Sequence, residues 1–346
     1  MKLEIKHKIN HEIIHYYQDN FMITSKYNKI FITKGMNQEC IKLPLDGWKS
    51  LFSFNRILRR LLRLDKCNVF PTKEGLVIIR MSKVYFYSYE SKKLTHTLTL
   101  QNCRNILHQS ATVLNGGKEI IFGEYGMNPN RKEVPVYKSE DSGKSWKKVY
   151  VFEPGKIKHI HGCYYDPFED KIWIFTGDYK NECFIVKADK EFKSLEWIGD
   201  GSQIYRGCST FFTKNYVYWA MDSEFEDNYL LRLDRKTKTL DKLRTFPGPI
   251  IYTKTLKDGI YLLSTVKDKG PGIKDNYAHL YASKDLKKWE EIGKWRHDGL
   301  PVRFFKSGII SFADGEQTSK DFYIFGEALI GLDGKIARCL LEKNSA

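Results

Sequence analysis

Short apolar runs recur along the chain, and each ends at a polar or small residue. Seven such runs, KIFIT, GLVIIR, EIIFGE, IWIFTGD, VYWAMD, IYLLST and GIISFAD, end near Thr33, Arg80, Glu124, Asp178, Asp222, Thr265 and Asp314. Runs of this length, rich in Ile, Val, Tyr and Phe and followed by turn residues, are typical of β-strands. Their ends lie 43 to 54 residues apart, which indicates a repeated structural unit.

Two further series keep the same spacing. Acidic residues mark predicted turns at Glu90, Asp141, Asp189, Asp234, Asp285 and Asp333. Polar or aromatic residues begin a further strand in each unit, at His108, His161, Arg206, Tyr252 and Arg303. A unit of about 48 residues built from short strands has the length of a β-propeller blade.

We therefore predict an all-β fold, a single β-propeller domain of six or seven blades spanning residues 1–346. The C-terminal segment 322–342 is expected to share a blade with the N-terminal strands. A pair of β-sandwiches is the alternative fold, but it does not explain three series in phase. One segment departs from the pattern: residues 50–66, SLFSFNRILRRLLRLDK, predict a basic amphipathic helical insertion near 50–65.

The clearest turn is SEDSGKSW, with Ser139, Asp141, Gly143 and Trp146 in the order of a tight hairpin. Shorter or looser copies occur at 187–197, 232–240 and 282–289. The motif resembles the Asp-box of sialidase-like (BNR-repeat) propellers. The stretches FGEYG, HIHGCYYDP, FTGD and YWAMDS also resemble a group of Asp-box proteins usually labelled glycosyl-hydrolase-like. The Phe-Arg-Ile-Pro motif of true sialidases does not occur here, so the resemblance does not imply sialidase activity.

Equivalent positions of successive blades come together in a propeller, and here they carry charged and imidazole groups. We predict catalytic roles for four of these residues and substrate-binding roles for five others. The predicted catalytic residues are Glu124, His161, Asp178 and Asp222. The predicted substrate-binding residues are Tyr125, His159, Arg206, Tyr252 and Arg303. His159 and His161 are two residues apart, a spacing that a metal site can use, but this pair alone does not predict a metal.

The residue types favour a glycan-active enzyme acting on an acidic sugar, and two reactions stay open. A hydrolase would use two of the three carboxylates as acid and as nucleophile or base. A lyase would use His161 as the base, Arg206 to neutralise a uronate carboxylate, and Tyr125 or Tyr252 as the acid. The alternative function is a non-catalytic propeller that binds a glycan or a partner, tied to polysaccharide assembly at a membrane.

The net charge bears on the class of binding partner, and the cysteine content bears on the cellular location. The formal net charge of +15 suits an acidic oligo- or polysaccharide, whereas no nucleic-acid-binding motif is present. We predict no cofactor and no metal. The N-terminal segment lacks an apolar signal sequence, and seven dispersed cysteines fit reduced thiols, so we expect a cytoplasmic protein. Arg56, Arg59, Arg60 and Arg63 form one face of the predicted helix, which suggests peripheral contact with the inner face of a membrane; the alternative is a packed helix with solvated arginines.

Overall fold

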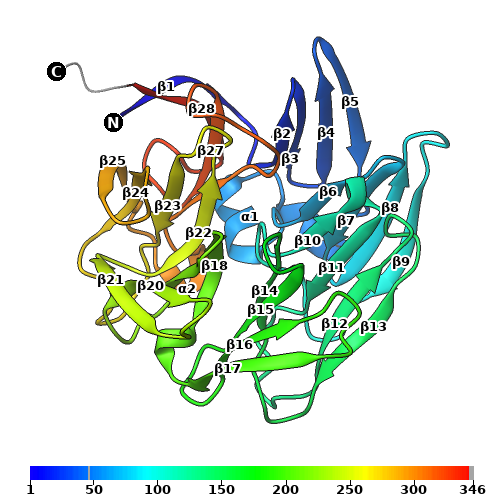
Figure 1. Cartoon of the computed structure of the whole chain (residues 1–346). Helices are drawn as coiled ribbons and strands as arrows, with labels where there is room; N and C mark the ends of the chain where they lie inside the picture. Colours follow the sequence, from blue (N-terminus) through cyan, green and yellow to red (C-terminus); the bar gives the residue numbers. More distant parts are fainter. Residues whose placement is uncertain (46, 343–346) are drawn as a thin grey trace. The chain divides into compact units, whose positions relative to one another are not determined.

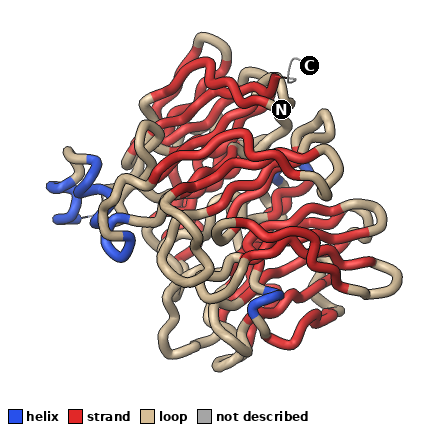
Figure 2. The backbone as a smooth tube through the Cα atoms, turned by 90° about the vertical axis from the view of Figure 1, so that its left-hand side faces the viewer, coloured by secondary structure: helices blue, strands red, loops and turns tan. Residues whose placement is uncertain are grey.

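The computed structural model describes residues 1–45 and 47–342, except the side chain of residue 49. The chain divides into two compact units. Unit 1 comprises Met1–Lys66, Glu224–Asn228 and Arg244–Ala346, and unit 2 comprises Cys67–Ser223 and Tyr229–Leu243. Strands make up most of the chain, and the helical segments are few and short (Figure 2).

Unit 1 contains three four-stranded antiparallel sheets. They are β2 (Ile13–Gln18), β3 (Phe21–Lys26), β4 (Lys29–Lys34) and β5 (Asn37–Lys42); β22 (Ile250–Thr255), β23 (Tyr261–Thr265), β24 (Tyr277–Ser283) and β25 (Trp289–Arg296); and β26 (Ile309–Phe312), β27 (Phe322–Glu327), β28 (Lys335–Glu342) and β1 (Lys2–Ile9). In the last sheet β1 pairs antiparallel with β28, from Lys2 opposite Glu342 to Ile9 opposite Ile336 (Figure 1). The predicted sharing of one blade by the two ends of the chain is therefore confirmed.

Unit 2 contains four sheets of the same kind. They are β6 (Asn68–Pro71), β7 (Gly75–Arg80), β8 (Lys83–Ser88) and β9 (Leu94–Thr99); β10 (Thr112–Leu114), β11 (Glu119–Gly123), β12 (Val134–Ser139) and β13 (Lys147–Phe152); β14 (Ile160–Asp166), β15 (Lys171–Thr176), β16 (Cys183–Ala188) and β17 (Leu195–Gly201); and β18 (Gly207–Phe212), β19 (Tyr216–Met221), β20 (Asn228–Asp234) and β21 (Leu240–Phe246). The described residues thus form seven four-stranded sheets, the blades of a seven-bladed β-propeller.

Burial explains why the apolar runs become the inner strands of the sheets. Every residue of β7 is buried, whereas β9 of the same sheet has only exposed and half-buried residues. The apolar runs supply strands that are covered on both faces, and the polar strands that follow stand at the sheet edge. Charged and threonine side chains on an edge strand also discourage pairing with another chain.

The predicted hairpin turns are confirmed where third and fourth strands join. Ser139 Oγ accepts a hydrogen bond from Gly143 N at 2.8 Å, and Asp141 Oδ1 accepts one from Ser145 N at 2.9 Å. Trp146 packs on Phe122 with 5.0 Å between ring centroids. The looser copies also lie between third and fourth strands, where Asp189, Asp234 and Asp285 accept bonds from local backbone amides.

Gly143 is where this turn depends most on having no side chain. Its φ is +88°, and an added Cβ would lie 2.2 Å from Val77 Cγ2. We expect Gly143→Ala to lower the free energy of unfolding by about 1–3 kcal/mol, since backbone strain and a clash combine. Gly155→Ala is the matched control, because Gly155 has φ +84° with nothing within 4 Å of the added Cβ. If urea unfolding gives equal losses of unfolding free energy in the two variants, backbone strain alone accounts for the loss at the hairpin.

Several residues of the predicted repeat series lie at other places in their sheets than the repeat predicts. Asp333 lies between β27 and β28, the second and third strands of its sheet, and Asp314 follows a first strand. Thr33 belongs to β4, a third strand. Arg303 begins no strand and lies in α2 (Val302–Phe305). In the sheet that contains β26, the phase shifts because residues 297–308, which include α2, lengthen the connection between β25 and β26.

The predicted insertion is helical but shorter than its apolar pattern suggests. Residues 47–66 form a 3₁₀ segment, η1 (Gly47–Phe52), and a two-turn helix, α1 (Arg56–Leu62). Asn55 separates them, because its side chain caps α1 by accepting a hydrogen bond from Ile57 N at 2.7 Å. Two further 3₁₀ turns are η2 (Asn115–Gly117) and η3 (Gln203–Tyr205). None of the helices in residues 1–45 and 47–342 combines the length and apolar character that a bilayer span requires.

Candidate functional site

Two adjacent sheets of unit 2 bring together a cluster of charged and imidazole side chains. His161 lies in β14, Asp178 follows β15, Arg206 precedes β18 and Asp222 follows β19. His159 stands immediately before β14. The register of β14 against β15 shifts between Ile160 and Gly162, so His161 occupies a bulge. Bulges redirect a side chain out of the regular alternation, and this one turns His161 toward Asp178.

Asp178 is the centre of this cluster. Its Oδ1 lies 3.1 Å from His161 Nε2, 3.3 Å from His159 Nε2 and 3.2 Å from the Arg206 guanidinium. Its Oδ2 forms an ion pair with Lys158 Nζ. The Lys158 ammonium and the Arg206 guanidinium both pair with this carboxylate and favour its ionised form. Asp178 is therefore an ionised carboxylate surrounded by cationic and nitrogen groups.

Asp222 has a different environment, although Arg206 also faces it at 3.6 Å. The Cys208 thiol donates to Asp222 Oδ2 at 3.2 Å. Burial raises the pKa of Asp222 to about 6, with Arg206 and His161 acting in the opposite direction. Burial and the neighbouring Asp222 raise the pKa of the Cys208 thiol as well. The side chains of Asp178 and Asp222 are each 14% exposed, so both reach the surface of this unit.

The imidazoles are held by backbone carbonyls. His159 Nδ1 lies 2.7 Å from Gly126 O, and His161 Nδ1 lies 3.0 Å from Gly207 O. Because a carbonyl only accepts hydrogen bonds, both Nδ1 atoms carry the hydrogen and both Nε2 atoms face Asp178. The Tyr125 ring contacts His159 with 4.3 Å between centroids. Five predicted site residues thus gather around Asp178: Tyr125, His159, His161, Arg206 and Asp222.

Three predicted site residues have other surroundings. The Glu124 carboxylate accepts hydrogen bonds from Gln101 N and Asn102 N, both at 2.8 Å, and from Tyr137 Oη at 3.1 Å. It fixes the segment after β9, and we leave it out of the proposed chemistry. Tyr252 and Arg303 belong to unit 1, where Tyr252 is buried in the hydrophobic core and Arg303 lies exposed on α2.

Two residues of the cluster were not predicted from the sequence. Lys158 precedes His159 directly, in a segment without regular alternation, so no periodic pattern marks it. Cys208 lies two residues after Arg206, and a period of two would place the two side chains on one face. The donor atoms that lie within 4.8 Å of one another form two groups, His159 with His161 and Asp178, and His161 with Cys208 and Asp222. Both groups have the size of a metal-binding set.

The fold and this cluster define the chain as a seven-bladed β-propeller with a charged site in unit 2. Comparison of the structure with solved structures agrees on the fold. A chain titled "YCF48 bound to D1 peptide" aligns with a TM-score of 0.56 and 12% identity, over 98% of this chain and 96% of that one. The extracellular domain of the hybrid two-component system BT4673 from B. thetaiotaomicron aligns with a TM-score of 0.57 and 12% identity, over 100% of this chain and 40% of that one.

At this identity the likeness shows the fold alone. No protein-family model matches the chain, and a comparison with curated proteins gives no significant match. The resemblance to Asp-box proteins therefore stays a prediction from the sequence, whereas the hairpin that suggested it is present in the structure.

Proposed function

We propose that the cluster around Asp178 is the active site of an enzyme that cleaves an acidic glycan by elimination. The observation that carries this proposal is the convergence of Lys158, Arg206 and two imidazoles beside the partly exposed Asp222. A carboxylate with this many cationic neighbours leaves the site rich in groups that attract a second anion. A uronate carboxylate has the required charge and fits the fork of an arginine.

Elimination suits these residues better than hydrolysis by paired carboxylates. Hydrolysis needs two carboxylates with open access to the sugar, but Asp178 is held by four groups and Glu124 by three. In an elimination, the base removes the proton on the carbon next to the uronate carboxylate. The bond to the leaving oxygen then breaks, and an acid protonates that oxygen. Arg206 would face the substrate carboxylate, Asp222 would accept the proton and Tyr125 would supply one.

His161 has a different role in this arrangement from the one its sequence position suggested. Its side chain is only 1% exposed, and its two ring nitrogens face Gly207 O and Asp178. A base must touch the carbon-bound proton that it removes. We therefore assign His161 to positioning Asp178, and Asp222 to the proton transfer.

The substrate class is tested by binding. Uronate-containing oligosaccharides and neutral oligosaccharides of equal length are titrated into the protein by calorimetry at two salt concentrations. We expect binding of the uronates only, with an affinity that falls as salt increases, because the attraction is partly electrostatic. Equal binding of neutral and acidic chains would overturn the proposed substrate class.

A second proposal concerns unit 1, where α1 has the opposite orientation to that expected from its arginines. Arg59 pairs with Glu12, Arg56 with Asp65 and Asp333, and Arg60 with Asp298. The side chains of Arg56, Arg59 and Arg60 are 20%, 11% and 2% exposed, so the predicted solvent-facing basic face is wrong for these three. The fourth, Arg63, is half-buried. The arginine face of α1 is turned toward the interior of unit 1 because its side chains form ion pairs with carboxylates there.

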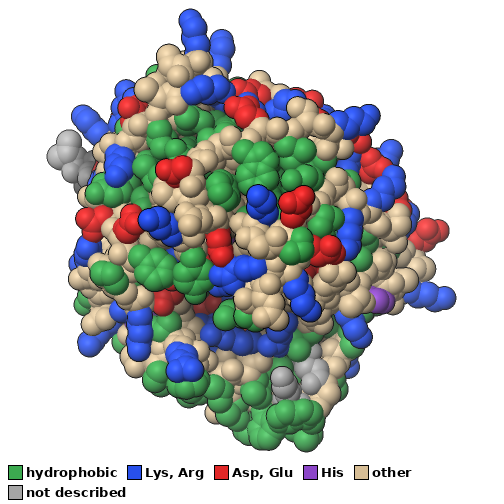
Figure 3. Space-filling model, turned by 90° about the horizontal axis from the view of Figure 1, so that it is seen from below, with side chains coloured by type: hydrophobic (Ala, Val, Ile, Leu, Met, Phe, Trp, Pro, Cys, Tyr) green, Lys and Arg blue, Asp and Glu red, His purple; other side chains and the backbone are tan. Residues whose placement is uncertain are grey.

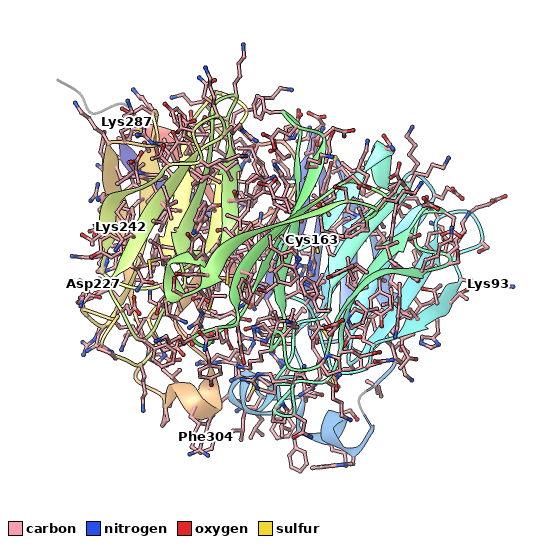
Figure 4. All side chains as sticks on the ribbon, turned by 60° about the horizontal axis from the view of Figure 1, so that its bottom comes forward. Lys93, Cys163, Asp227, Lys242, Lys287 and Phe304 are labelled. Atoms are coloured by element: carbon pink, nitrogen blue, oxygen red, sulfur yellow. The ribbon has the colours of Figure 1, made fainter. Side chains whose placement is uncertain are left out.

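The apolar side chains of η1 and α1 are consequently exposed. Exposed fractions are 66% for Trp48, 74% for Leu51, 79% for Phe54 and 48% for Ile57. Phe304 of α2 is 52% exposed and projects away from the strands (Figure 4). Lys and Arg side chains are spread over the face drawn in Figure 3, with Asp and Glu among them. We name the five apolar residues the apolar surface of unit 1.

We propose that this apolar surface inserts into the interface of an anionic lipid bilayer. Trp and Phe suit that depth, Arg303 stands exposed beside Phe304, and the net charge of +15 attracts anionic lipid. We expect flotation with phosphatidylglycerol vesicles to fall about tenfold or more per residue when Trp48, Phe54 and Phe304 are changed to Ser. Met36→Ser is the control, since Met36 is fully exposed on another turn. Lipid contact would be contradicted if the triple variant floats with vesicles like the wild type, or if its substitutions only disrupt a dimer.

A further inference from the structure

The two imidazoles and Asp178 present a conflict among hydrogen-bond acceptors. With Nδ1 donating to a carbonyl, each neutral imidazole offers a lone pair at Nε2. Both Nε2 atoms face the same atom, Asp178 Oδ1, at 3.1 and 3.3 Å. That oxygen is itself an acceptor, so two neutral rings and the carboxylate would oppose one another.

Protons resolve this conflict only in part. One additional proton on His161 gives a hydrogen bond to Asp178 and leaves His159 without a donor at Nε2. His159 Nε2 is in fact a buried atom for which the described residues provide no hydrogen-bond partner, and its side chain is 4% exposed.

A divalent metal ion satisfies all three acceptors at once. We propose that His159 Nε2, His161 Nε2 and Asp178 Oδ1 bind a first-row transition-metal ion, with zinc as the best fit to the ligands. The three atoms lie within 4.8 Å of one another. Metal-binding histidines characteristically donate their other ring nitrogen to a backbone carbonyl, as both of these do.

The neighbouring groups agree with this choice of ligands. Lys158 bonds Oδ2 of Asp178, whereas Arg206 lies 3.2 Å from Oδ1, the oxygen that would also bind the metal. The other donor group uses Cys208, whose hydrogen is already given to Asp222, so it offers a thiol rather than a thiolate. Two histidines and one carboxylate make three protein ligands, the number found in catalytic sites that keep a position open.

The open position gives the ion a role that rests on the proposed function. A uronate carboxylate bound there would lose negative charge to the ion, which makes the neighbouring C–H proton easier to remove. Binding of the ion itself does not depend on this role. The expectation from sequence, that no metal is bound, is replaced by this proposal.

Metal binding is tested with Zn²⁺ and Co²⁺ on the full chain. We expect one tightly held Zn²⁺ per chain by elemental analysis after dialysis. His159→Gln and His161→Gln are each expected to weaken the Zn²⁺ Kd at least about 100-fold. His96→Gln is the control, because His96 is exposed and lies in the same unit. The Co²⁺ protein should show visible d–d bands without a thiolate charge-transfer band, and Cys208→Ser should leave them unchanged.

Two results would overturn the metal site: no stoichiometric ion in the wild-type protein, or unchanged Zn²⁺ affinity in the His159→Gln/His161→Gln variant. If the variants do not fold by circular dichroism, X-ray absorption on the Zn²⁺-loaded wild type decides, since two imidazole ligands must be visible. Cleavage of uronates by protein stripped with chelator would reject the catalytic role of the ion and keep the enzyme. Bound zinc without any cleavage would keep the metal and reject the enzyme.

Discussion

Lys306→Met is expected to lower the free energy of unfolding by about 3–5 kcal/mol, because it removes the cation that buried Asp65 and Glu327 share, while Asp65 keeps its ion pair with Arg56. Lys306 Nζ lies 2.9 Å from Asp65 Oδ1 and 2.8 Å from Glu327 Oε1. The exposed fractions of the Lys306, Asp65 and Glu327 side chains are 1%, 1% and 8%. Removing the ammonium leaves negative charge where water cannot reach it. Chemical denaturation, followed by circular dichroism, measures the loss.

Lys257→Met is the matched control in the same unit. Lys257 pairs with Glu316 at 2.9 Å, but the two side chains are 67% and 60% exposed. Exposed pairs contribute about 0–1 kcal/mol, so this variant should unfold almost like the wild type. Similar losses in both variants would show that burial of the Lys306 cluster does not determine its effect.

The same cluster gives a dependence of stability on pH. Burial by itself raises the pKa of Glu327, but Lys306 and Lys66 outweigh it and lower that pKa from 4.5 to about 2. A carboxylate with a lowered pKa in the folded state stabilises fully above its ordinary pKa and loses this contribution as pH falls toward the folded value. The contribution of Glu327 to the free energy of unfolding of the wild type should therefore decline between about pH 4.5 and 2. In Lys306→Met this decline should be smaller.

Arg206→Met is expected to reduce kcat/KM on a uronate substrate by about 10²- to 10³-fold, the usual loss for one stabilising donor. Its guanidinium lies 3.2 Å from Asp178 and 3.6 Å from Asp222, and it is the cation that links the two carboxylates. Arg206→Lys should restore little, since an ammonium cannot bond two oxygens side by side. Initial rates at several substrate concentrations separate a loss of binding from a loss of turnover.

Arg232→Met is the control for this loss. Arg232 lies in the same unit and pairs with Asp241 at 2.7 Å near the surface, away from the described cluster. Its kcat/KM should match that of the wild type. If Arg206→Met retains wild-type kcat/KM while the wild type is active, Arg206 does not contact the substrate.

The repeat could be read from the sequence because it depends on local pattern. Buried runs such as that of β7 and turn residues such as Asp141 act within a few positions of one another. The blade count was left at six or seven because one blade joins residues from the two ends of the chain. Asp333 was assigned to the wrong turn because the long connection between β25 and β26 displaces the strands that follow it, and it serves instead as a partner of Arg56.

The convergence of the candidate residues was predicted in part. Equivalence between blades correctly brought together His161, Asp178, Arg206 and Asp222, because the sheets repeat their geometry. Contacts between side chains and distant parts of the chain follow no such pattern in the sequence. Arg60 forms an ion pair with Asp298, 238 residues away, and the Glu124 carboxylate accepts hydrogen bonds from the amides of Gln101 and Asn102. A sequence shows that these groups are charged or polar, but not that their partners already satisfy them.

We propose that the Asp178 cluster cleaves an acidic glycan by elimination. The most direct test is mass spectrometry of acidic and neutral oligosaccharides after incubation with the pure protein, beside Asp222→Asn. We expect only the acidic oligosaccharides to be cut. Each should give two fragments whose summed mass equals that of the substrate, and one fragment should carry an unsaturated end. Products heavier by one water would mean hydrolysis, and intact chains throughout would mean a propeller that binds without cleaving; either result contradicts the proposed elimination.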